Sequence, residues 1–275
     1  MNSKIFGVEL ITGRSNSTIA KISKLENKKS RNEEKLFCLD GVKLFLEAYK
    51  FGAEIEYLIV KDDARLDEDV IAKIMSLKER TRLICVSEAV FSKLTEENAP
   101  QGIITVCKYL KNHRFTGAVN GCDEKEKIMV FESVRDPGNI GAIIRNAAAF
   151  GVDRLILSSD CADVYSQKVL RATMGAIFKV KIDIVTDLKS TLKSLKNSGR
   201  RVISTTLRNN SLKLGKDAIF PQDVFIIGNE GHGVSEETIE FSNETLFIPM
   251  RENTESLNAS VAAAVLMWEQ YKYNI

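Results

Sequence analysis

The chain has 275 residues, of which 44% are apolar and 28% are charged, and its formal net charge is +2. These values are typical of a soluble globular protein, and no apolar run approaches the roughly 18 residues that a membrane helix needs. The N-terminus contains no hydrophobic signal segment, and the five cysteines form no C-x-x-C pair. This pattern argues against secretion, a disulfide framework and a zinc site. We therefore expect a reduced cytoplasmic protein with no membrane partner and no metal.

The first 35 residues carry eight basic and four acidic side chains. Within them, residues 16–30 are polar and lysine-rich, which predicts a helix with a mobile connection. A basic arm on a nearly neutral body favours a polyanionic partner. The same modest excess is also common on a solvated helix face, so charge alone leaves both interpretations open.

Residues 36–109 alternate between short apolar runs and segments with helical spacing. The predicted strands are 36–39, 57–60, 82–86 and 102–109. The predicted helices are 42–51, 67–79 and 87–94. This alternation indicates a small α/β domain with a mainly parallel sheet.

Residues 111–126 interrupt the pattern with asparagines, glycines and clustered charges, which predicts a linker. A second α/β series follows it. Its predicted strands are 128–132, 154–158, 201–206, 224–228 and 245–248. Its predicted helices are about 140–150, 164–175, 187–198 and 257–271. We therefore expect one domain over residues 1–110, a linker over 111–126 and a second domain over 127–275.

Three polar segments of the second domain each lie where an apolar run meets a turn. The first runs from the strand at 128–132 through Pro137-Gly138-Asn139 into an amphipathic helix that contains Arg145. Asn139 and Arg145 are near enough along the chain to converge on one ligand. Alternatively, Asn139 caps the helix and Arg145 is an ordinary surface cation.

The second segment, Gly228-Asn229-Glu230-Gly231-His232-Gly233, follows an apolar run of the buried parallel type. Its glycines allow backbone amides to approach a ligand closely. The Lys and Ser/Thr of a P-loop are missing, as is the third glycine of a dinucleotide turn. Glu230 would repel a phosphate and tolerate a cation, or else it caps the helix that starts near Ser235.

The third segment joins the strand at 245–248 to the last helix through Pro249 and a polar loop. Ser256 and Asn258 at the start of that helix can cap it, and they can also bind a substrate hydroxyl. The apolar stripe of Val261, Val265 and Trp268 farther along is more typical of packing than of recognition.

In this order, the three segments resemble the SpoU (TrmH-like) family of RNA 2′-O-ribose methyltransferases in the SPOUT superfamily. The resemblance extends from about residue 128 to 271 and includes the stretch from Lys168 to Gly175. The first half, with Leu39-Asp40-Gly41 and Pro100-Gln101-Gly102-Ile103, looks like the ribosomal-protein-like substrate-binding domain that often precedes it.

The resemblance implies an α/β fold in which a C-terminal SPOUT domain with a parallel sheet and a deep trefoil knot follows a small α/β substrate-binding domain. It also implies a homodimer whose active site is built partly from the partner chain, with S-adenosyl-L-methionine bound in the knot. The residues that match the family's cofactor contacts are Gly228, Ile248 and Leu257. Those that match its catalytic residues are Asn139, Arg145, Glu230, Ser256 and Asn258.

The implied reaction is methyl transfer to a ribose 2′-hydroxyl of RNA, and the fused first domain favours 23S-type ribosomal RNA over transfer RNA. Arg145 is the family's proposed base, but a guanidinium keeps its proton at physiological pH. Our hypothesis is therefore that Arg145 binds the neighbouring phosphate or the developing alkoxide. The alternative function is an RNA-binding or ribosome-assembly protein that kept the fold and is catalytically silent.

Overall fold

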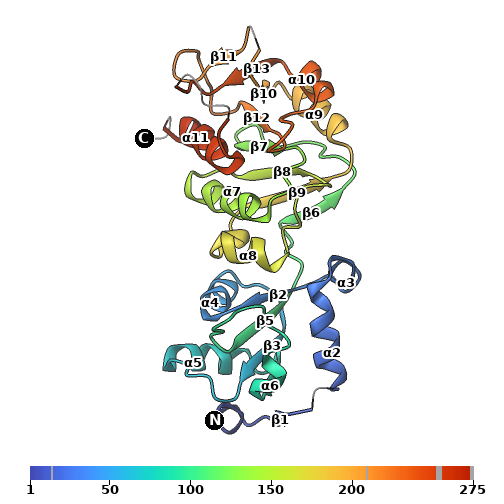
Figure 1. Cartoon of the computed structure of the whole chain (residues 1–275), viewed down its shortest axis with the longest axis vertical. Coiled ribbons are helices and arrows are strands. Elements are labelled where there is room, and N and C mark those ends of the chain that lie inside the picture. Colours follow the sequence, from blue (N-terminus) through green and yellow to red (C-terminus); the bar gives the residue numbers. More distant parts are fainter. Residues whose placement is uncertain (14, 209, 252–255, 273–275) are drawn as a thin grey trace. The chain divides into compact units, whose positions relative to one another are not determined.

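A computed structural model of the chain describes residues 1–13, 15–208, 210–251 and 256–272 (Figure 1). It divides into two compact units. The first unit contains Met1–Leu110 together with Tyr165–Phe178, and the second contains Lys111–Val164 together with Lys179–Ile275. Each unit has its own sheet and its own hydrophobic core.

The first unit contains a five-stranded sheet in the order β1-β4-β3-β5-β2. Its strands are β1 (Leu10–Ile11), β2 (Leu36–Asp40), β3 (Ile55–Lys61), β4 (Arg82–Val86) and β5 (Ile103–Lys108). Strand β4 pairs in parallel with β1 and β3, but β5 pairs antiparallel with β2 and β3. The expectation of a mainly parallel sheet was therefore wrong. Helix α6 (Glu88–Phe91) is a single turn that does not carry the chain back across the sheet, so β5 returns in the opposite direction.

Helices flank both sides of this sheet (Figure 1). On one side lie α2 (Ser17–Ser23), η1 (Lys24–Glu26) and α3 (Lys28–Glu34), and on the other lie α4 (Val42–Lys50) and α5 (Glu68–Leu77). The remaining helical segments of this unit are α1 (Asn2–Phe6), α8 (Gln167–Thr173) and η2 (Ala176–Phe178).

The basic arm is folded onto the first unit, contrary to the expectation of a mobile connection. Ile19, Ile22 and Leu25 are buried in the core that also contains strand residues. The Arg31 guanidinium is buried and donates hydrogen bonds to the carbonyl oxygens of Leu25 and Glu26, at 2.7 and 2.6 Å. Arg31 therefore holds the arm together and is not a surface cation.

The second unit is built on an eight-stranded sheet in the order β11-β13-β10-β12-β7-β8-β9-β6, with every pairing parallel. Its strands are β6 (His113–Thr116), β7 (Ile128–Phe131), β8 (Arg154–Ser158), β9 (Lys181–Val185), β10 (Val202–Thr205), β11 (Leu212–Lys213), β12 (Val224–Ile227) and β13 (Glu244–Phe247). Strand β6 lies inside residues 111–126, which were expected to form a linker. Its backbone pairs with β9 at the sheet edge, a contact that its loop-like composition does not reveal.

Two pairs of helices flank this sheet (Figure 1). Helix α7 (Pro137–Ala149) packs against α11 (Ala259–Tyr271), and α9 (Leu188–Asn197) contacts α10 (Glu236–Phe241). In the described part of the chain, no helix is long and apolar enough to span a bilayer, and no cluster of His, Cys, Asp and Glu side chains could hold a metal ion.

Candidate active site

The three polar segments meet at one edge of the second sheet. Strands β13, β10, β12 and β7 are consecutive neighbours and run in parallel, so their carboxyl ends lie side by side. Gly228 directly follows β12, and Ile248 directly follows β13. Open α/β sheets bind their ligands at this edge.

Asn139 links the three segments through its side chain. Its Nδ2 donates to Glu230 Oε1 at 2.9 Å, and its Oδ1 accepts from Asn258 Nδ2 at 2.9 Å. Asn139 is not the helix cap, because Asp136 holds that position and its Oδ1 accepts from the Asn139 backbone N–H at 2.8 Å. With Asp136 capping α7, the buried Asn139 amide is free to join the turn after β12 to the start of α11.

The turn after β12 is closed by hydrogen bonds centred on Asn229. The backbone N–H and C=O of Asn229 pair with those of Gly233, at 2.9 and 2.8 Å. The Asn229 Oδ1 accepts from the backbone N–H groups of Gly231 and His232, and its Nδ2 donates to the Ser133 carbonyl. A Cβ on Gly228 would lie 2.1 Å from the Gly233 carbonyl carbon, so only glycine fits there. Sequence reasoning passed over Asn229, although its place within the glycines was a usable signal.

Glu230 does not cap the following helix. Ser235 is the N-cap of α10, and its Oγ accepts from the Thr238 backbone N–H at 3.3 Å. The Glu132 carboxylate accepts hydrogen bonds from the Ser235 backbone N–H at 2.9 Å and from the Thr238 hydroxyl at 2.9 Å. Glu132 was missed from the sequence, and its position directly after a buried strand was the available signal.

Asn258 is the N-cap of α11. Its Oδ1 accepts from the backbone N–H groups of Ser260 and Val261, while its Nδ2 is the donor to Asn139. Next to it, Ser256 is exposed and Leu257 is half-buried. Residues 252–255 of this loop lie outside the described part of the chain.

Arg145 is exposed on α7 and is not joined to the Asn139 link. It follows Asn139 by six residues, whereas Asn146, one residue further, completes two turns and shares the Asn139 face. Accordingly, Asn146 Nδ2 donates to the Ser260 carbonyl of α11 at 3.4 Å. No described residue forms an ion pair or hydrogen bond with the Arg145 guanidinium. Within one chain the structure thus joins Asn139, Glu230 and Asn258 and leaves Arg145 apart.

Residues 126–268 match the profile of the SpoU rRNA Methylase family, and residues 16–105 match that of the MRM3-like substrate binding domain. The family match covers more than half of the chain. The chain belongs to the SpoU family. It is 31% identical, over 94% of its length and 97% of the relative's, to the 23S rRNA (guanosine(2553)-2′-O)-methyltransferase RlmP of Bacillus subtilis.

Solved structures agree with this membership. The AdoMet-bound rRNA methyltransferase from Sinorhizobium meliloti superimposes with a TM-score of 0.82 at 26% identity, over 97% of this chain and 98% of that one. A solved RNA 2′-O ribose methyltransferase superimposes with a TM-score of 0.79 at 26% identity, over 97% and 99% of the two chains. The likeness to these methyltransferases therefore extends over both units, and S-adenosylmethionine is the cofactor of the family.

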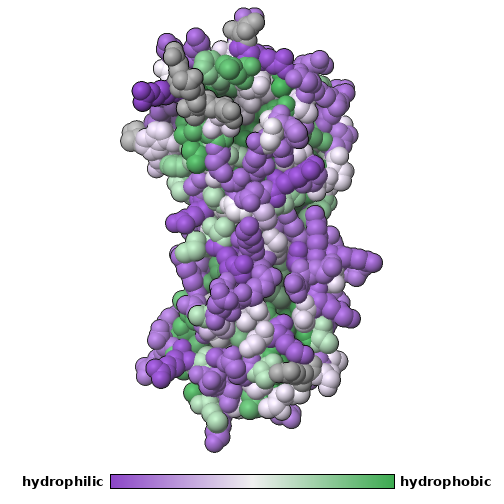
Figure 2. Space-filling view, viewed as in Figure 1, coloured by the Kyte–Doolittle hydropathy of each residue, from purple (hydrophilic) through white to green (hydrophobic). Residues whose placement is uncertain are grey.

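The carboxyl edge of the sheet in this SpoU protein has the chemistry that S-adenosylmethionine requires. Leu207 follows β10 and Met250 follows β13, and these side chains are 75% and 41% exposed. Figure 2 shows hydrophobic side chains at the surface over β11 and β13. Exposed apolar groups beside a glycine-rich turn offer a planar ring both a contact surface and backbone hydrogen bonds. The predicted contacts at Gly228 and Ile248 lie at this edge.

Proposed function

We propose that this SpoU protein transfers the methyl group of S-adenosylmethionine to a ribose 2′-hydroxyl of RNA, with 23S-type ribosomal RNA as the substrate ahead of transfer RNA. The observation that carries the proposal is the hydrogen-bonded link from Glu230 through Asn139 to Asn258 at the carboxyl edge of the sheet. The match to a substrate-binding domain and the B. subtilis relative support ribosomal RNA as the substrate.

The bound cofactor supplies a methyl group already activated on sulfonium, so the chain's task is alignment and activation of the hydroxyl. Asn139 and Asn258 already use their amides within the chain, which makes both of them positioning residues for the turn and for α11. Gly228, Ile248 and Leu257 hold the cofactor, and the exposed Ser256 orients the ribose. Glu230 fixes the turn through Asn139.

The Arg145 guanidinium binds the phosphate next to the target ribose or the developing alkoxide. A guanidinium offers two parallel N–H donors to such a group, and charge-assisted bonds of this kind are stronger than neutral ones. Its exposure and its lack of a partner among the described residues support this role.

The protein acts as a cytoplasmic homodimer, and Arg145 completes the active site of the partner chain. The supporting observation is an aromatic cluster on the α7–α11 face. Trp268 lies 6.0 Å from the rings of both Phe150 and Tyr271, and it remains 46% exposed. We also infer that the second unit contains a deep trefoil knot, an inference supported by the packing of α11, the helix that follows β13 in the chain, on α7 and β12.

The first test is binding and transfer. Isothermal titration of the protein with S-adenosylmethionine should show saturable binding, and mapping of 2′-O-methyl groups should show a ribosomal RNA site that disappears when the gene is deleted. A catalytically silent RNA-binding protein would give neither result.

The second test concerns Arg145. Arg145→Lys keeps the charge but loses the paired donors, so we expect methyl transfer to fall by about 10²-fold while affinity for S-adenosylmethionine is unchanged. Arg65→Lys is the matched control and should retain turnover, because Arg65 is exposed on the first unit and its side chain has no described partner. Nearly full activity of Arg145→Lys would exclude a role for bidentate geometry.

A further inference from the structure

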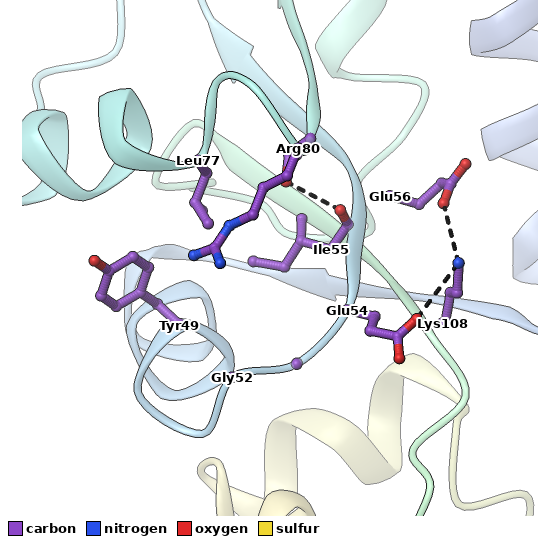
Figure 3. A pocket seen from close by; sticks show the side chains of 10 residues that line it. Tyr49, Gly52, Glu54, Ile55, Glu56, Leu77, Arg80 and Lys108 are labelled. Atoms are coloured by element: carbon purple, nitrogen blue, oxygen red, sulfur yellow. Dashed lines mark hydrogen bonds and ion pairs between the residues drawn. The ribbon is translucent and has the colours of Figure 1, made fainter.

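The first unit contains a cavity of about 260 Å³ between the ends of α4 and α5 and the start of β3 (Figure 3). It lies far along the chain from every residue assigned to methyl transfer. Its size is below that of pockets for drug-sized ligands, which begin at about 300 Å³. It is lined by Tyr49, Gly52, Ala53, Glu54, Ile55, Glu56, Leu77, Arg80, Thr81 and Lys108.

A cation and an aromatic ring face each other across this cavity. Figure 3 shows the Arg80 guanidinium pointing toward the Tyr49 ring. Among the residues that the structure describes, none forms a hydrogen bond or an ion pair with that guanidinium. The Tyr49 ring is held in place, because its hydroxyl lies 3.2 Å from Ser76 Oγ and its centroid lies 6.4 Å from that of Phe45. The ring is a preformed platform with a free planar cation opposite it.

The charges at the rim do not favour an anion. Lys108 Nζ lies 3.4 Å from a Glu54 carboxylate oxygen and 3.9 Å from one of Glu56 (Figure 3). With Arg80, the rim therefore holds two cations and two carboxylates, and its formal charges cancel. A free phosphate would gain little here and would meet the two glutamates.

The floor of the cavity is apolar. Ile55 and Leu77 are buried beneath it. The Thr81 hydroxyl is already used, since it donates to the Ile55 carbonyl at 3.0 Å. An apolar floor, an aromatic wall and an opposing guanidinium are suited to a flat, uncharged and partly polar group.

We propose that this pocket takes one unstacked base of single-stranded RNA, held between the Tyr49 ring and the Arg80 guanidinium. Aromatic rings and guanidinium planes are the surfaces on which proteins stack splayed bases. Stacking of this kind accepts any base, so the pocket anchors RNA on the first unit without selecting the methylated nucleotide. The inference rests on the proposed function in that its ligand is RNA.

The test compares two fluorescently labelled single-stranded oligoribonucleotides of equal length with the full-length protein by anisotropy. One probe carries bases throughout, and the other has abasic sites at its centre and so keeps the phosphates. We expect Tyr49→Leu to weaken binding of the first probe by about tenfold and to leave the second unchanged. Tyr49→Phe keeps the ring, and its binding should match that of the unaltered protein.

Arg80 is tested in the same assay. Arg80→Lys keeps the charge but loses the planar group, so we expect a several-fold loss for the base-bearing probe only. Lys93→Ala is the control for charge, because Lys93 is exposed, lies outside the pocket and has no described partner. Its removal should affect the two probes equally, because both carry the same phosphates, and Tyr49→Leu should not change the salt dependence of binding.

Equal losses on both probes for Tyr49→Leu, or no loss at all, would overturn the proposal, as would failure of the unaltered protein to prefer the base-bearing probe. Circular dichroism melting of each variant establishes that the first unit is folded, and Tyr49→Phe preserves the packing if Tyr49→Leu does not. Titration of the same samples with S-adenosylmethionine separates this result from a failure of the proposed function. Tyr49 and Arg80 both belong to the first unit, so their substitutions should leave binding of the cofactor unchanged.

Discussion

Each half of the Asn139 amide makes one hydrogen bond to a different part of the chain. Its Nδ2 holds Glu230 and its Oδ1 holds Asn258, so the turn after β12 and the start of α11 are fixed to the same buried side chain. A carboxamide can do this because it combines two donors with an acceptor, whereas a carboxylate offers acceptors only. At the residue scale, the site is a set of fixed backbone segments and the exposed side chains that these segments present.

Gly228 is the residue whose substitution should be least tolerated. A Cβ there would lie 2.1 Å from one backbone atom of Gly233 and 2.2 Å from another, and a backbone cannot move aside cheaply. We expect Gly228→Ala to lower the free energy of unfolding by about 1–3 kcal/mol and to abolish binding of S-adenosylmethionine. Urea denaturation and calorimetry provide the two measurements.

Gly231 is the matched control in the same turn. A Cβ there would meet only Asn229 Oδ1, at 3.4 Å. Gly231→Ala should therefore stay close to the parent in stability, and a Gly228→Ala protein that bound the cofactor normally would rule out close packing of the turn as the reason for this glycine.

Asn258 has two roles that substitutions can separate: its Oδ1 caps α11, and its Nδ2 donates to Asn139. Asn258→Ser keeps a good N-cap but loses the donor to Asn139, which should lower stability by about 1–3 kcal/mol and reduce methyl transfer. Asn258→Ala also loses the cap, at a further cost of about 1 kcal/mol. Denaturant titration measures the stability of both variants. Asn146→Ala is the control, because it removes another hydrogen bond between α7 and α11, the 3.4 Å bond to the Ser260 carbonyl. Equal effects of Asn146→Ala and Asn258→Ser would remove any special role of the Asn139 link.

At the scale of elements, a buried ionic network fixes strands β6, β8 and β9. Arg154 on β8 donates to Glu126 at 3.0 and 2.9 Å and is also paired with Asp183 on β9. Asp183 further accepts from Arg114 on β6 at 2.6 and 2.9 Å. Because isolated buried charges are costly, this network ties the segment 111–126 to the sheet.

The network predicts a specific acid sensitivity. Burial alone would raise the pKa of Glu126, but hydrogen bonds from Arg154 and Lys181 outweigh it and hold the pKa below the usual 4.5. A carboxyl group with a lowered pKa stabilises the fold above its unfolded pKa, and this contribution is lost as the pH falls through the folded value. We expect Glu126→Gln to cost about 1.5–3 kcal/mol at pH 7 and progressively less below pH 4.5.

Urea denaturation of both proteins over a pH series measures this difference. Glu237→Gln, which alters the exposed ion pair with Lys189, is the control and should show no comparable change. A Glu126→Gln deficit that stayed constant across the series would show that ionisation of Glu126 is not its source.

At the scale of the whole molecule, helix α11 has two different sides. Leu266 and Met267 are fully buried in the second unit, whereas Val261 and Trp268 are each 46% exposed. The two exposed positions are seven residues apart and therefore share one face of the helix. The apolar stripe that the sequence assigned to packing is thus only partly packed within the chain, as expected for one side of the proposed subunit contact.

Trp268→Glu tests that contact. A charge placed in an apolar interface is strongly unfavourable, so we expect the variant to run as a monomer in analytical ultracentrifugation and to lose methyl transfer, because Arg145 is then separated from the partner's site. Met75→Glu, on the exposed side of helix α5 in the first unit, is the control and should not change the association state. A Trp268→Glu protein that remained dimeric would place the subunit contact elsewhere.

The order of the three polar segments was enough to determine the family. Most of the strands were also predicted, because continuous apolar runs such as 128–132, 154–158 and 224–228 form strands where they are buried in a parallel sheet. The edge strand β6 escaped prediction because its pairing with β9 and the Arg114–Asp183 ion pair hold it, and its own sequence is largely polar. Strand β9 was missed although Ile182 and Val185 are buried, because Asp183 interrupts its apolar run. Sequence also named Asn139, Glu230 and Asn258 without showing how they meet. Only the tertiary structure brought Glu230 and Asn258 each to 2.9 Å from the Asn139 amide, because hydrogen-bond partners 91 and 119 residues apart are selected by the sheet order and not by local spacing.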